Sequence, residues 1–319
     1  MGTTASAAAR NAGQEGAERK TFTIPLALLQ QIRPFATTLA FETEFSLDPV
    51  HQTVRLSAGQ RKAVHAPILP GLTINLHTHP SEAIYGRGFE HHPPTDADLL
   101  RVLGDSLKAF KPVTSVVVEP GGVWVYRPTF GLLLYMLDLQ PDLPLIIFNG
   151  GQVSKQVVNV YDILRTNTGI LGHDLAFGKI TLDQYLTETR HYLLTPPPPD
   201  TQGAQQSPQH PLNDDGFDIQ YYPFDELTTD ISVPAWKLPH HLLRDEGGCT
   251  NPGFPVAELV QALPSILAQW QTVVDPTQIP RDSWVPICRA PKRRLSTFAL
   301  PQPPQALSAG GRRRRQSVS

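Results

Sequence analysis

The chain alternates hydrophobic and polar residues from position 39 to position 47, which predicts a β-strand with one buried face. The two faces of this strand would carry Leu39, Phe41, Phe45 and Leu47 on one side and Ala40, Glu42, Glu44 and Ser46 on the other. The dipeptide Asp48-Pro49 favours a turn, and a second strand is predicted around residues 54–56. A third strand is predicted over residues 72–79, because Pro80 ends the run.

Helical spacing occurs on both sides of these strands. Apolar residues follow Pro25 at positions 26, 29 and 32, which predicts a short helix that stops before Pro34. Apolar positions 99, 103, 107 and 110 predict an amphipathic helix with Thr95 as its N-cap. Two β-branched and aromatic runs flank Pro120-Gly121-Gly122 and predict a hairpin, and a further helix is predicted over residues 182–194.

Prolines are spread unevenly, since most of the 32 follow residue 195. This shift in composition predicts that the last third of the chain packs less well than the rest. The predicted regions are a flexible leader (1–21), a folded domain (22–195), a Pro/Gln-rich linker (196–216), a small accessory region (217–288) and a disordered basic tail (289–319).

Composition narrows the class of protein. With 40% hydrophobic residues in 319, the chain can bury a sizeable core, which excludes a wholly disordered protein. Its two cysteines, Cys249 and Cys288, exclude a disulfide scaffold and a four-cysteine zinc module. No apolar run approaches the roughly 18 residues of a membrane span, and the leader lacks the hydrophobic core of a secretory signal. We therefore expect an intracellular protein that is neither secreted nor bound to a membrane.

Positive charge is concentrated in the tail, although the net charge of the whole chain is -2. The tail has no acidic residue, and its basic residues are Arg289, Lys292, Arg293, Arg294 and Arg312 to Arg315. Such clusters are read by import receptors or bind nucleic acid weakly and without sequence preference. We favour import, with weak nucleic-acid contact and a merely solvated tail as the alternatives.

The segment His77-Thr78-His79-Pro80 carries the most informative chemistry. Residues two apart on a strand share a face, so His77 and His79 can direct two imidazoles at one point. Asp98, in the first turn of the next predicted helix, would add a third ligand. A zinc ion with three protein ligands keeps its fourth position for water, so the pattern predicts a Zn²⁺ site.

Hydrolysis at such a site also needs a proton acceptor and a donor to the developing oxyanion. Glu42 and Glu44 are the candidate bases, and periodicity does not choose between them because they share a face. Thr95 offers its hydroxyl as the oxyanion donor. Each feature alone has a simpler interpretation, since paired histidines are often core residues and Thr95 with Asp98 suits any helix start. Their ordered combination favours the metal site.

Glu90, His91 and His92 form a further polar cluster between Pro80 and the predicted helix. We interpret them as exposed loop residues. Contact with the metal, gating of the cleft or contact with substrate are the alternatives.

These motifs resemble the JAMM or MPN-type (JAB-domain) metalloproteases, whose signature is an upstream Glu, His-Ser/Thr-His-Pro and Ser-x-x-Asp. The matching residues are Glu42, His77-Thr78-His79-Pro80 and Thr95-Asp96-Ala97-Asp98, and the resemblance covers residues 22–130, including the hairpin. Thr95 replaces the signature serine and adds a methyl group. The segment between His79 and Asp98 is longer than in cellular members and looks like versions encoded by large DNA viruses.

The resemblance implies an α/β fold of the MPN/JAB, cytidine-deaminase-like type: a mixed, mostly antiparallel sheet flanked by helices, followed by an additional Pro-rich C-terminal region. It implies Zn²⁺ held by His77, His79 and Asp98, Glu42 as general acid/base and Thr95 as oxyanion donor. The implied activity is hydrolysis of peptide or isopeptide bonds in ubiquitin-like or other protein conjugates, in the host nucleus or cytoplasm. The alternative is an MPN-type structural or virion-associated interaction protein without peptidase activity.

Overall fold

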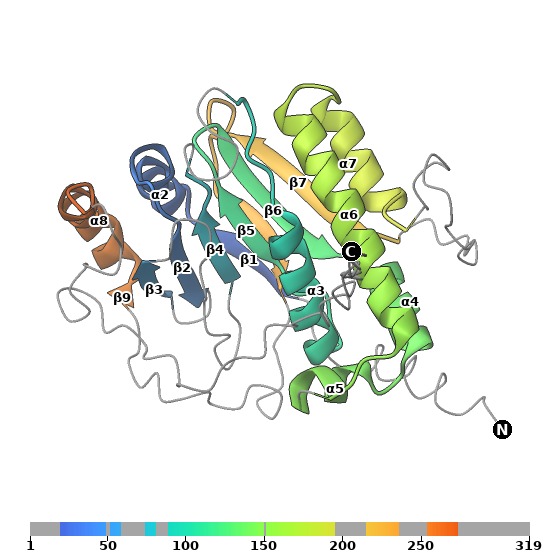
Figure 1. Cartoon of the computed structure of the whole chain (residues 1–319). Helices are drawn as coiled ribbons and strands as arrows, with labels where there is room; N and C mark the ends of the chain where they lie inside the picture. Colours follow the sequence, from blue (N-terminus) through green and yellow to red (C-terminus); the bar gives the residue numbers. More distant parts are fainter. Residues whose placement is uncertain are drawn as a thin grey trace, which may run out of the picture.

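The computed structural model describes residues 20–48, 52–58, 74–80, 89–149, 151–194, 215–235 and 254–273. These residues form an α/β fold in which a mixed sheet lies between two layers of helices (Figure 1). Several predictions concern residues outside these ranges: most of the leader, Pro49 of the predicted turn, nearly all of the linker, and the basic tail.

The main sheet has the strand order β7-β6-β5-β4-β2-β3-β9. Only the neighbours β4 and β5 are parallel in this described sheet, so it is mixed and mostly antiparallel, as predicted. A second, two-stranded sheet pairs β1 with β8. The strands are β1 (Lys20–Ile24), β2 (Thr43–Asp48), β3 (Thr53–Ala58), β4 (Ile74–Thr78), β5 (Ser115–Val118), β6 (Gly122–Pro128), β7 (Phe217–Pro223), β8 (Ile231–Ala235) and β9 (Phe254–Pro255).

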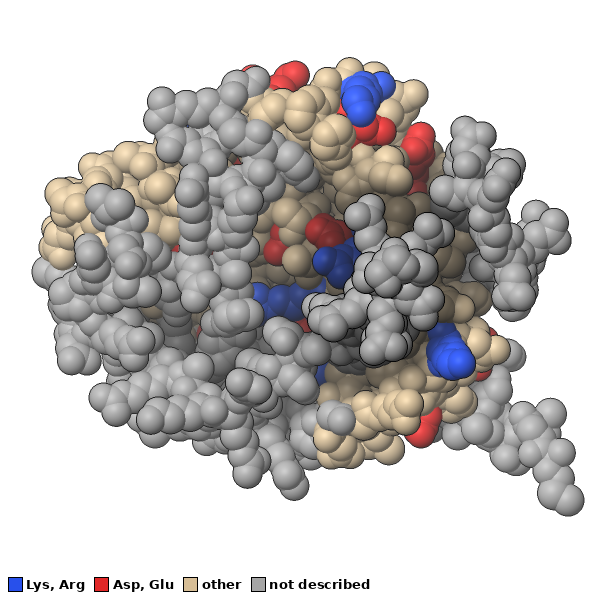
Figure 2. Space-filling view, in the orientation of Figure 1, with Lys and Arg blue, Asp and Glu red and all other residues tan. Residues whose placement is uncertain are grey.

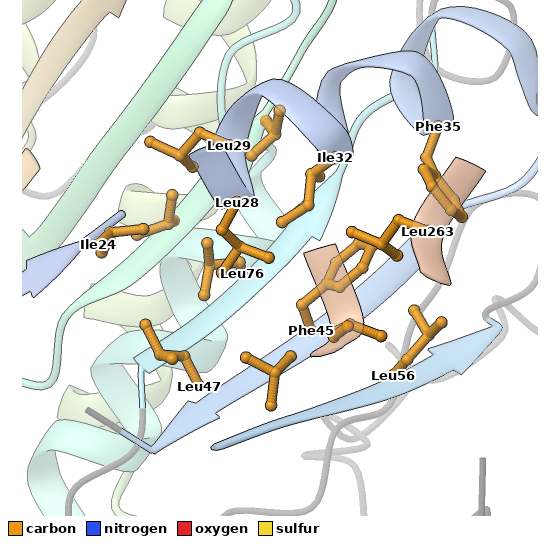
Figure 3. Packing of buried hydrophobic residues seen from close by; sticks show 14 of the residues in the cluster. Ile24, Leu28, Leu29, Ile32, Phe35, Phe45, Leu47, Leu56, Leu76 and Leu263 are labelled. Carbon is orange, nitrogen blue, oxygen red and sulfur yellow. The ribbon is translucent and has the colours of Figure 1, made fainter. Parts of the chain in front are cut away.

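One face of the main sheet is covered by α2 (Leu26–Thr38), α8 (Val256–Trp270) and the small β1-β8 sheet. Phe45 of β2 packs edge-on against Phe35 of α2, with 5.7 Å between the ring centroids, and Phe35 in turn meets Trp270 at 6.0 Å. Figure 3 shows Leu263 of α8 beside Phe45 in this layer. The first hydrophobic core therefore joins the two ends of the described chain.

Helix α2 continues through Pro34, so the prediction that it stops before this proline is wrong. Proline removes one helical hydrogen bond and strains the preceding turn. Phe35 and Ala36, directly after it, are both fully buried. Burial of their apolar surface outweighs the local penalty.

The opposite face of the sheet is covered by five helices of the described chain. They are α3 (Asp96–Ala109), α4 (Phe130–Leu139), α5 (Leu143–Asn149), α6 (Lys155–Ala176) and α7 (Leu182–His191). Leucines of α3 pack on Val117, Trp124 and Tyr126 of the hairpin and form the second core. The hairpin and the amphipathic helix after Thr95 are thus confirmed, and α7 ends three residues before its predicted end.

The prediction of a half-buried strand over residues 39–47 is wrong in two respects, because β2 begins only at Thr43 and both of its faces are covered. Phe45 and Leu47 face α2 and α8, as the alternation indicated. The polar side chains Glu44 and Ser46 are 2% and 6% exposed. They face the layer that contains α3, so the polar face of this strand points into the protein rather than into water.

The described parts of the predicted accessory region, 217–288, dock on the 22–195 unit. Strand β7 extends the main sheet beside β6, β9 pairs with β3, and β8 pairs with β1. Residues distant in sequence therefore complete the sheet that carries the candidate site. None of the helices in the described ranges is both long and apolar enough to cross a lipid bilayer.

Charge on the visible surface is mixed. In the part of the described surface that Figure 2 shows, basic and acidic side chains lie among uncharged ones, and the blue atoms form no continuous patch. The tail on which nucleic-acid contact was predicted lies outside the described residues.

Candidate metal centre

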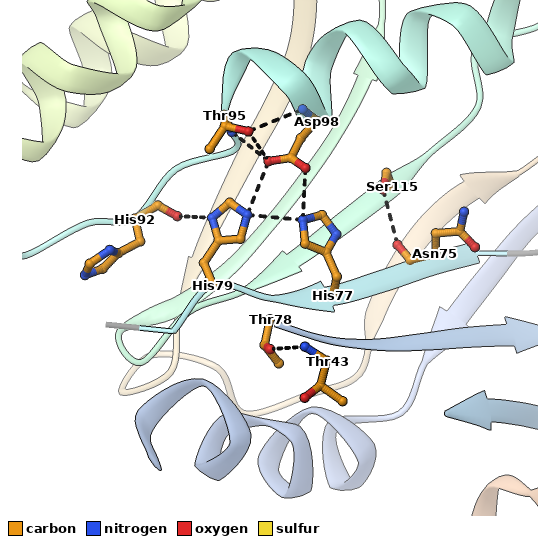
Figure 4. A network of polar contacts seen from close by, with 9 residues as sticks. All are labelled: Thr43, Asn75, His77, Thr78, His79, His92, Thr95, Asp98 and Ser115. Carbon is orange, nitrogen blue, oxygen red and sulfur yellow. Dashed lines mark hydrogen bonds and ion pairs between the residues drawn. The ribbon is translucent and has the colours of Figure 1, made fainter. Parts of the chain in front are cut away.

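His77 lies near the C-terminal end of β4 and His79 directly follows the strand, and both side chains point toward α3 (Figure 4). His77 stands opposite Glu44 of β2 and Val117 of β5. The backbone N–H of His79 donates to the carbonyl oxygen of Val118 over 2.9 Å, which extends the β4-β5 pairing to this residue. Both imidazoles are therefore buried and held by neighbouring strands.

Asp98 enters the site from the first turn of α3. Thr95 is the N-cap of this helix, and the two residues form a capping box. Asp98 Oδ2 accepts hydrogen bonds from the Thr95 backbone N–H over 2.8 Å and from the Thr95 hydroxyl over 2.7 Å. The helix start fixes the direction of the carboxylate. The hydroxyl predicted to serve an oxyanion here serves Asp98, and the oxyanion role stays a prediction.

The three side chains converge on one point. Asp98 Oδ1 is 3.2 Å from His77 Nε2, and Asp98 Oδ2 is 3.2 Å from His79 Nε2. The two Nε2 atoms are 3.1 Å apart. Ligand atoms placed about 2.0–2.1 Å from a tetrahedral zinc ion would lie about 3.3 Å from one another. The group of His77, His79 and Asp98 could therefore hold a metal ion with little rearrangement.

Hydrogen bonding by the His79 ring supports this interpretation. Its Nδ1 lies 3.1 Å from the carbonyl oxygen of His92, and because a carbonyl only accepts, Nδ1 carries the proton. In a neutral imidazole the lone pair is then on Nε2, which faces Asp98 Oδ2 and His77 Nε2. A proton on Nε2 or a metal ion among these atoms would each relieve their repulsion, and the raised pKa of His79 reflects the first of these. A carbonyl that fixes the tautomer of a histidine is also the usual support of a metal-ligating ring.

The pKa values of His77, His79 and Asp98 are shifted by burial and by their closeness to one another. Burial lowers the pKa of His77. Burial acts in the same direction on His79, but the hydrogen bond and charge of Asp98 outweigh it and raise the pKa of His79. Although burial opposes ionisation of Asp98, the two imidazoles hold its pKa well below its usual range. The site thus favours an ionised carboxylate and added positive charge beside it.

Glu44 pairs with His77 across β2 and β4, Glu42 lies directly before β2, and both side chains are buried. Burial raises the pKa of Glu42 to about 7, while His79 lowers it and Asp98 raises it. Burial raises the pKa of Glu44 to about 8, and its strongest charged neighbour is Arg101 of α3 rather than a histidine. The surroundings of the two carboxyls therefore differ, and Glu42 is the one whose pKa is affected by His79 and Asp98.

The interpretation of His91 and His92 as exposed loop residues is wrong. His92 is 2% exposed, and the His91 ring is half-buried between Trp124 and Tyr221, 5.9 and 5.0 Å from their ring centroids. Glu90 is exposed, as expected. The sequence interpretation missed the reason, which is that the side chain of Glu119 binds this segment from the end of β5. An acidic residue directly after three valines was the available signal.

Comparisons of the chain with models of protein families, with curated proteins and with solved structures gave no match. Interpretation of the site therefore rests on its own geometry. In that geometry, the described residues form an α/β protein in which β4 and α3 bring together a His-His-Asp group that could hold a metal ion.

Proposed function

We propose that this chain is a zinc-dependent hydrolase of the MPN/JAB type that cleaves peptide or isopeptide bonds, with ubiquitin-like conjugates as its substrate class. The observation that carries the proposal is the convergence of His77, His79 and Asp98 beside a buried carboxyl, Glu42. The substrate class comes from the resemblance of the motifs alone.

Zinc is the proposed ion because two imidazoles and one carboxylate suit it better than they suit magnesium or calcium, which prefer all-oxygen sites. When bound, zinc supplies Lewis-acid chemistry and a nucleophile at neutral pH. His77, His79 and Asp98 would hold it, and Thr95 would keep the Asp98 carboxylate oriented through the capping box.

Glu42 is the proposed general acid/base. In the metal-free protein burial raises the pKa of this carboxyl to about 7, so it can exchange a proton near neutral pH. A bound cation would lower this pKa and favour the carboxylate, the form that accepts a proton from the attacking water before passing it to the leaving amine nitrogen. Its burial excludes competing solvent from the carboxyl. The Thr95 hydroxyl is the proposed donor to the developing oxyanion, and in that role it would exchange its bond to Asp98 for one to the substrate.

The test uses the full-length protein purified without added metal. Elemental analysis should find about one zinc per chain, and the protein should cleave ubiquitin chains until a chelator removes the metal. The double variant His77→Ala, His79→Ala should lose both zinc and activity. His191→Ala, at the end of α7 and outside the site, is the matched control and should retain both.

Absence of zinc from the wild type, with no uptake when zinc is added, would overturn the proposal. Zinc at full occupancy without turnover of any ubiquitin-like conjugate would instead favour the alternative, an MPN-type interaction protein that retains a metal. These two results separate loss of the site from loss of the activity.

A further inference from the structure

Glu119, directly after β5, is a further buried carboxylate outside the His-His-Asp group. Its side chain is fully buried. Its Oε1 accepts a hydrogen bond from the Tyr221 hydroxyl over 2.7 Å and lies 3.4 Å from His91 Nδ1, and its Oε2 accepts one from the backbone N–H of His92. One carboxylate thus joins the β5-β6 hairpin, strand β7 and the segment that precedes α3.

The close approach of these parts depends on the glycines of the hairpin turn. A Cβ atom on Gly122 would lie 2.6 Å from the Tyr221 hydroxyl, and one on Gly121 would lie 3.0 Å from it. The Glu119 backbone N–H donates to the Gly122 carbonyl over 3.0 Å and closes the turn. The Pro-Gly-Gly sequence that predicts a hairpin also makes room for Tyr221 beside Glu119.

The residue that Glu119 holds leads directly to the candidate metal ligands. The His92 N–H binds Glu119, whereas the His92 carbonyl accepts from His79 Nδ1. Two prolines, which have restricted φ and no N–H, connect His92 to Thr95. Thr95 then donates two hydrogen bonds to Asp98. A short, stiff segment therefore touches two of the three ligands, and Glu119 fixes its first residue.

We infer that Glu119 is a positioning residue of the metal centre: it holds the 92–95 segment so that the His92 carbonyl sets the tautomer of His79 and Thr95 orients Asp98. This inference rests on the proposed metal site and adds a support that the signature motifs do not contain. It gives the buried His91-His92 pair a role in the site, with neither imidazole serving as a ligand.

The experiment measures zinc affinity of the full-length protein by competition with a chromophoric chelator. Glu119→Gln keeps the side-chain volume but replaces one accepting carboxylate oxygen with an amide N–H₂, which cannot accept the hydrogen bond made there now. This variant should bind zinc about 10–100-fold more weakly. Tyr221→Phe removes one donor to Glu119 and should weaken binding by a smaller factor. Asp218→Asn is the control, because Asp218 lies on the same strand, β7, and binds Arg127 and Arg190 away from the site. It should leave zinc affinity unchanged.

A second readout separates positioning from general destabilisation. The nitrogen chemical shifts of the His79 ring should report a proton on Nδ1 in the wild type and a mixture of tautomers in Glu119→Gln. A folded Glu119→Gln that binds zinc within twofold of the wild type would overturn the inference and leave the metal site intact. If Glu119→Gln does not fold, unchanged affinity in Tyr221→Phe overturns it. A wild type that binds no zinc overturns both this inference and the proposed function.

Discussion

Glu42, directly before β2, and Glu44, within it, are the same residue type, and their surroundings differ. Burial raises the pKa of both carboxyls; among charged neighbours, His79 and Asp98 act most strongly on Glu42, whereas Arg101 and Glu42 act most strongly on Glu44. This difference in neighbours, which periodicity does not reveal, favours Glu42 as the residue that exchanges protons with the substrate.

We therefore expect Glu42→Gln to abolish turnover while zinc stays bound, because the change removes a proton acceptor and no ligand. Glu44→Gln should keep most of the activity, since a carboxyl with a pKa of about 8 is already mostly protonated at neutral pH. Single-turnover rates and zinc content of both variants make the comparison. The opposite result, with Glu44→Gln inactive and Glu42→Gln active, would assign the base to Glu44.

The same two carboxyls predict how the stability of the metal-free chain depends on pH. Their pKa values are raised in the folded protein from 4.5 to about 7 and about 8, so each binds its proton more tightly folded than unfolded. Their contribution is complete below about pH 4.5 and is lost as the pH rises through about 7 and then 8. The free energy of unfolding should therefore fall across this window.

The measurement is urea unfolding with chelator present, at intervals from pH 5 to pH 8.5. The double variant Glu42→Gln, Glu44→Gln should show a flatter pH dependence than the wild type, by a difference on the order of a few kcal/mol. His77, His79 and Asp98 titrate in both proteins, so the two curves differ through the two glutamates and through the effect of the Glu42 charge on His79. Parallel curves for the two proteins would contradict the raised pKa values.

At the scale of single residues, the sequence was sufficient to propose the three metal ligands but not Glu119 and Tyr221, the residues proposed to hold them in place. His77, His79 and Asp98 could be proposed from local spacing, because His77 lies in β4, His79 directly follows it, and Asp98 lies in the first turn of the next element, α3. Glu119 and Tyr221 could not be found this way. Their contact joins segments about a hundred residues apart, and only the strand order places them together.

At the scale of elements, the residue that follows helix α3 has a backbone conformation that its side chain does not favour. Phe110, its C-cap, has a φ of 54°, in the left-handed region where glycine is the common residue. Its side chain is 51% exposed. The backbone conformation is maintained by hydrogen bonds from Phe110 and Lys111 to the last turn of the helix.

Phe110→Gly should therefore raise the free energy of unfolding by about 1 kcal/mol, because glycine adopts this conformation without a Cβ clash. Phe110→Ala is the matched control: it removes the ring but keeps the Cβ, and it should give no comparable gain. Thermal and urea unfolding of the wild type, Phe110→Gly and Phe110→Ala measure the three free energies of unfolding to be compared. Equal stabilisation by alanine would show that removal of the exposed ring is responsible.

Two helices show where local patterns mislead. Pro34 predicts an end to α2, but the buried Phe35 keeps the helix intact beyond it. Helix α6 was not predicted, although its buried residues Val157, Val160, Tyr161, Leu164, Thr168, Gly172 and Leu175 follow helical spacing. Thr168 and Gly172 interrupt the apolar stripe in sequence. They are buried because the helix packs closely on its neighbours, which composition does not disclose.

At the scale of the whole molecule, the C-terminal helix belongs to the first core. Leu263 of α8 is fully buried in the same cluster as Phe35 and Phe45. The sequence did not specify that α8 packs on α2 and β2, because the apolar residues of the Pro-rich third could equally have formed a separate unit. Pairing between distant strands, such as β3 with β9, is a non-local property.

Leu263→Ala should lower the free energy of unfolding by about 2–5 kcal/mol, as expected for a large-to-small change in a close-packed core. The control is Gln261→Ala, an exposed position on the same helix, for which a change within about 0.5 kcal/mol is expected. Urea unfolding monitored through tryptophan fluorescence measures both. A negligible effect of Leu263→Ala would mean that α8 is not docked in solution.

Strand β7 supplies a support of the metal centre, Tyr221, that is synthesised after all the candidate ligands. The three candidate ligands and Glu119 all precede residue 120, but Tyr221 reaches Glu119 only when the chain has been extended past β7. A nascent polypeptide that ends before that strand would carry every donor atom for the metal and lack one of the bonds that hold them in place. Tight capture of the ion would then be a property of the finished protein, and a ribosome-bound fragment would exchange it more readily.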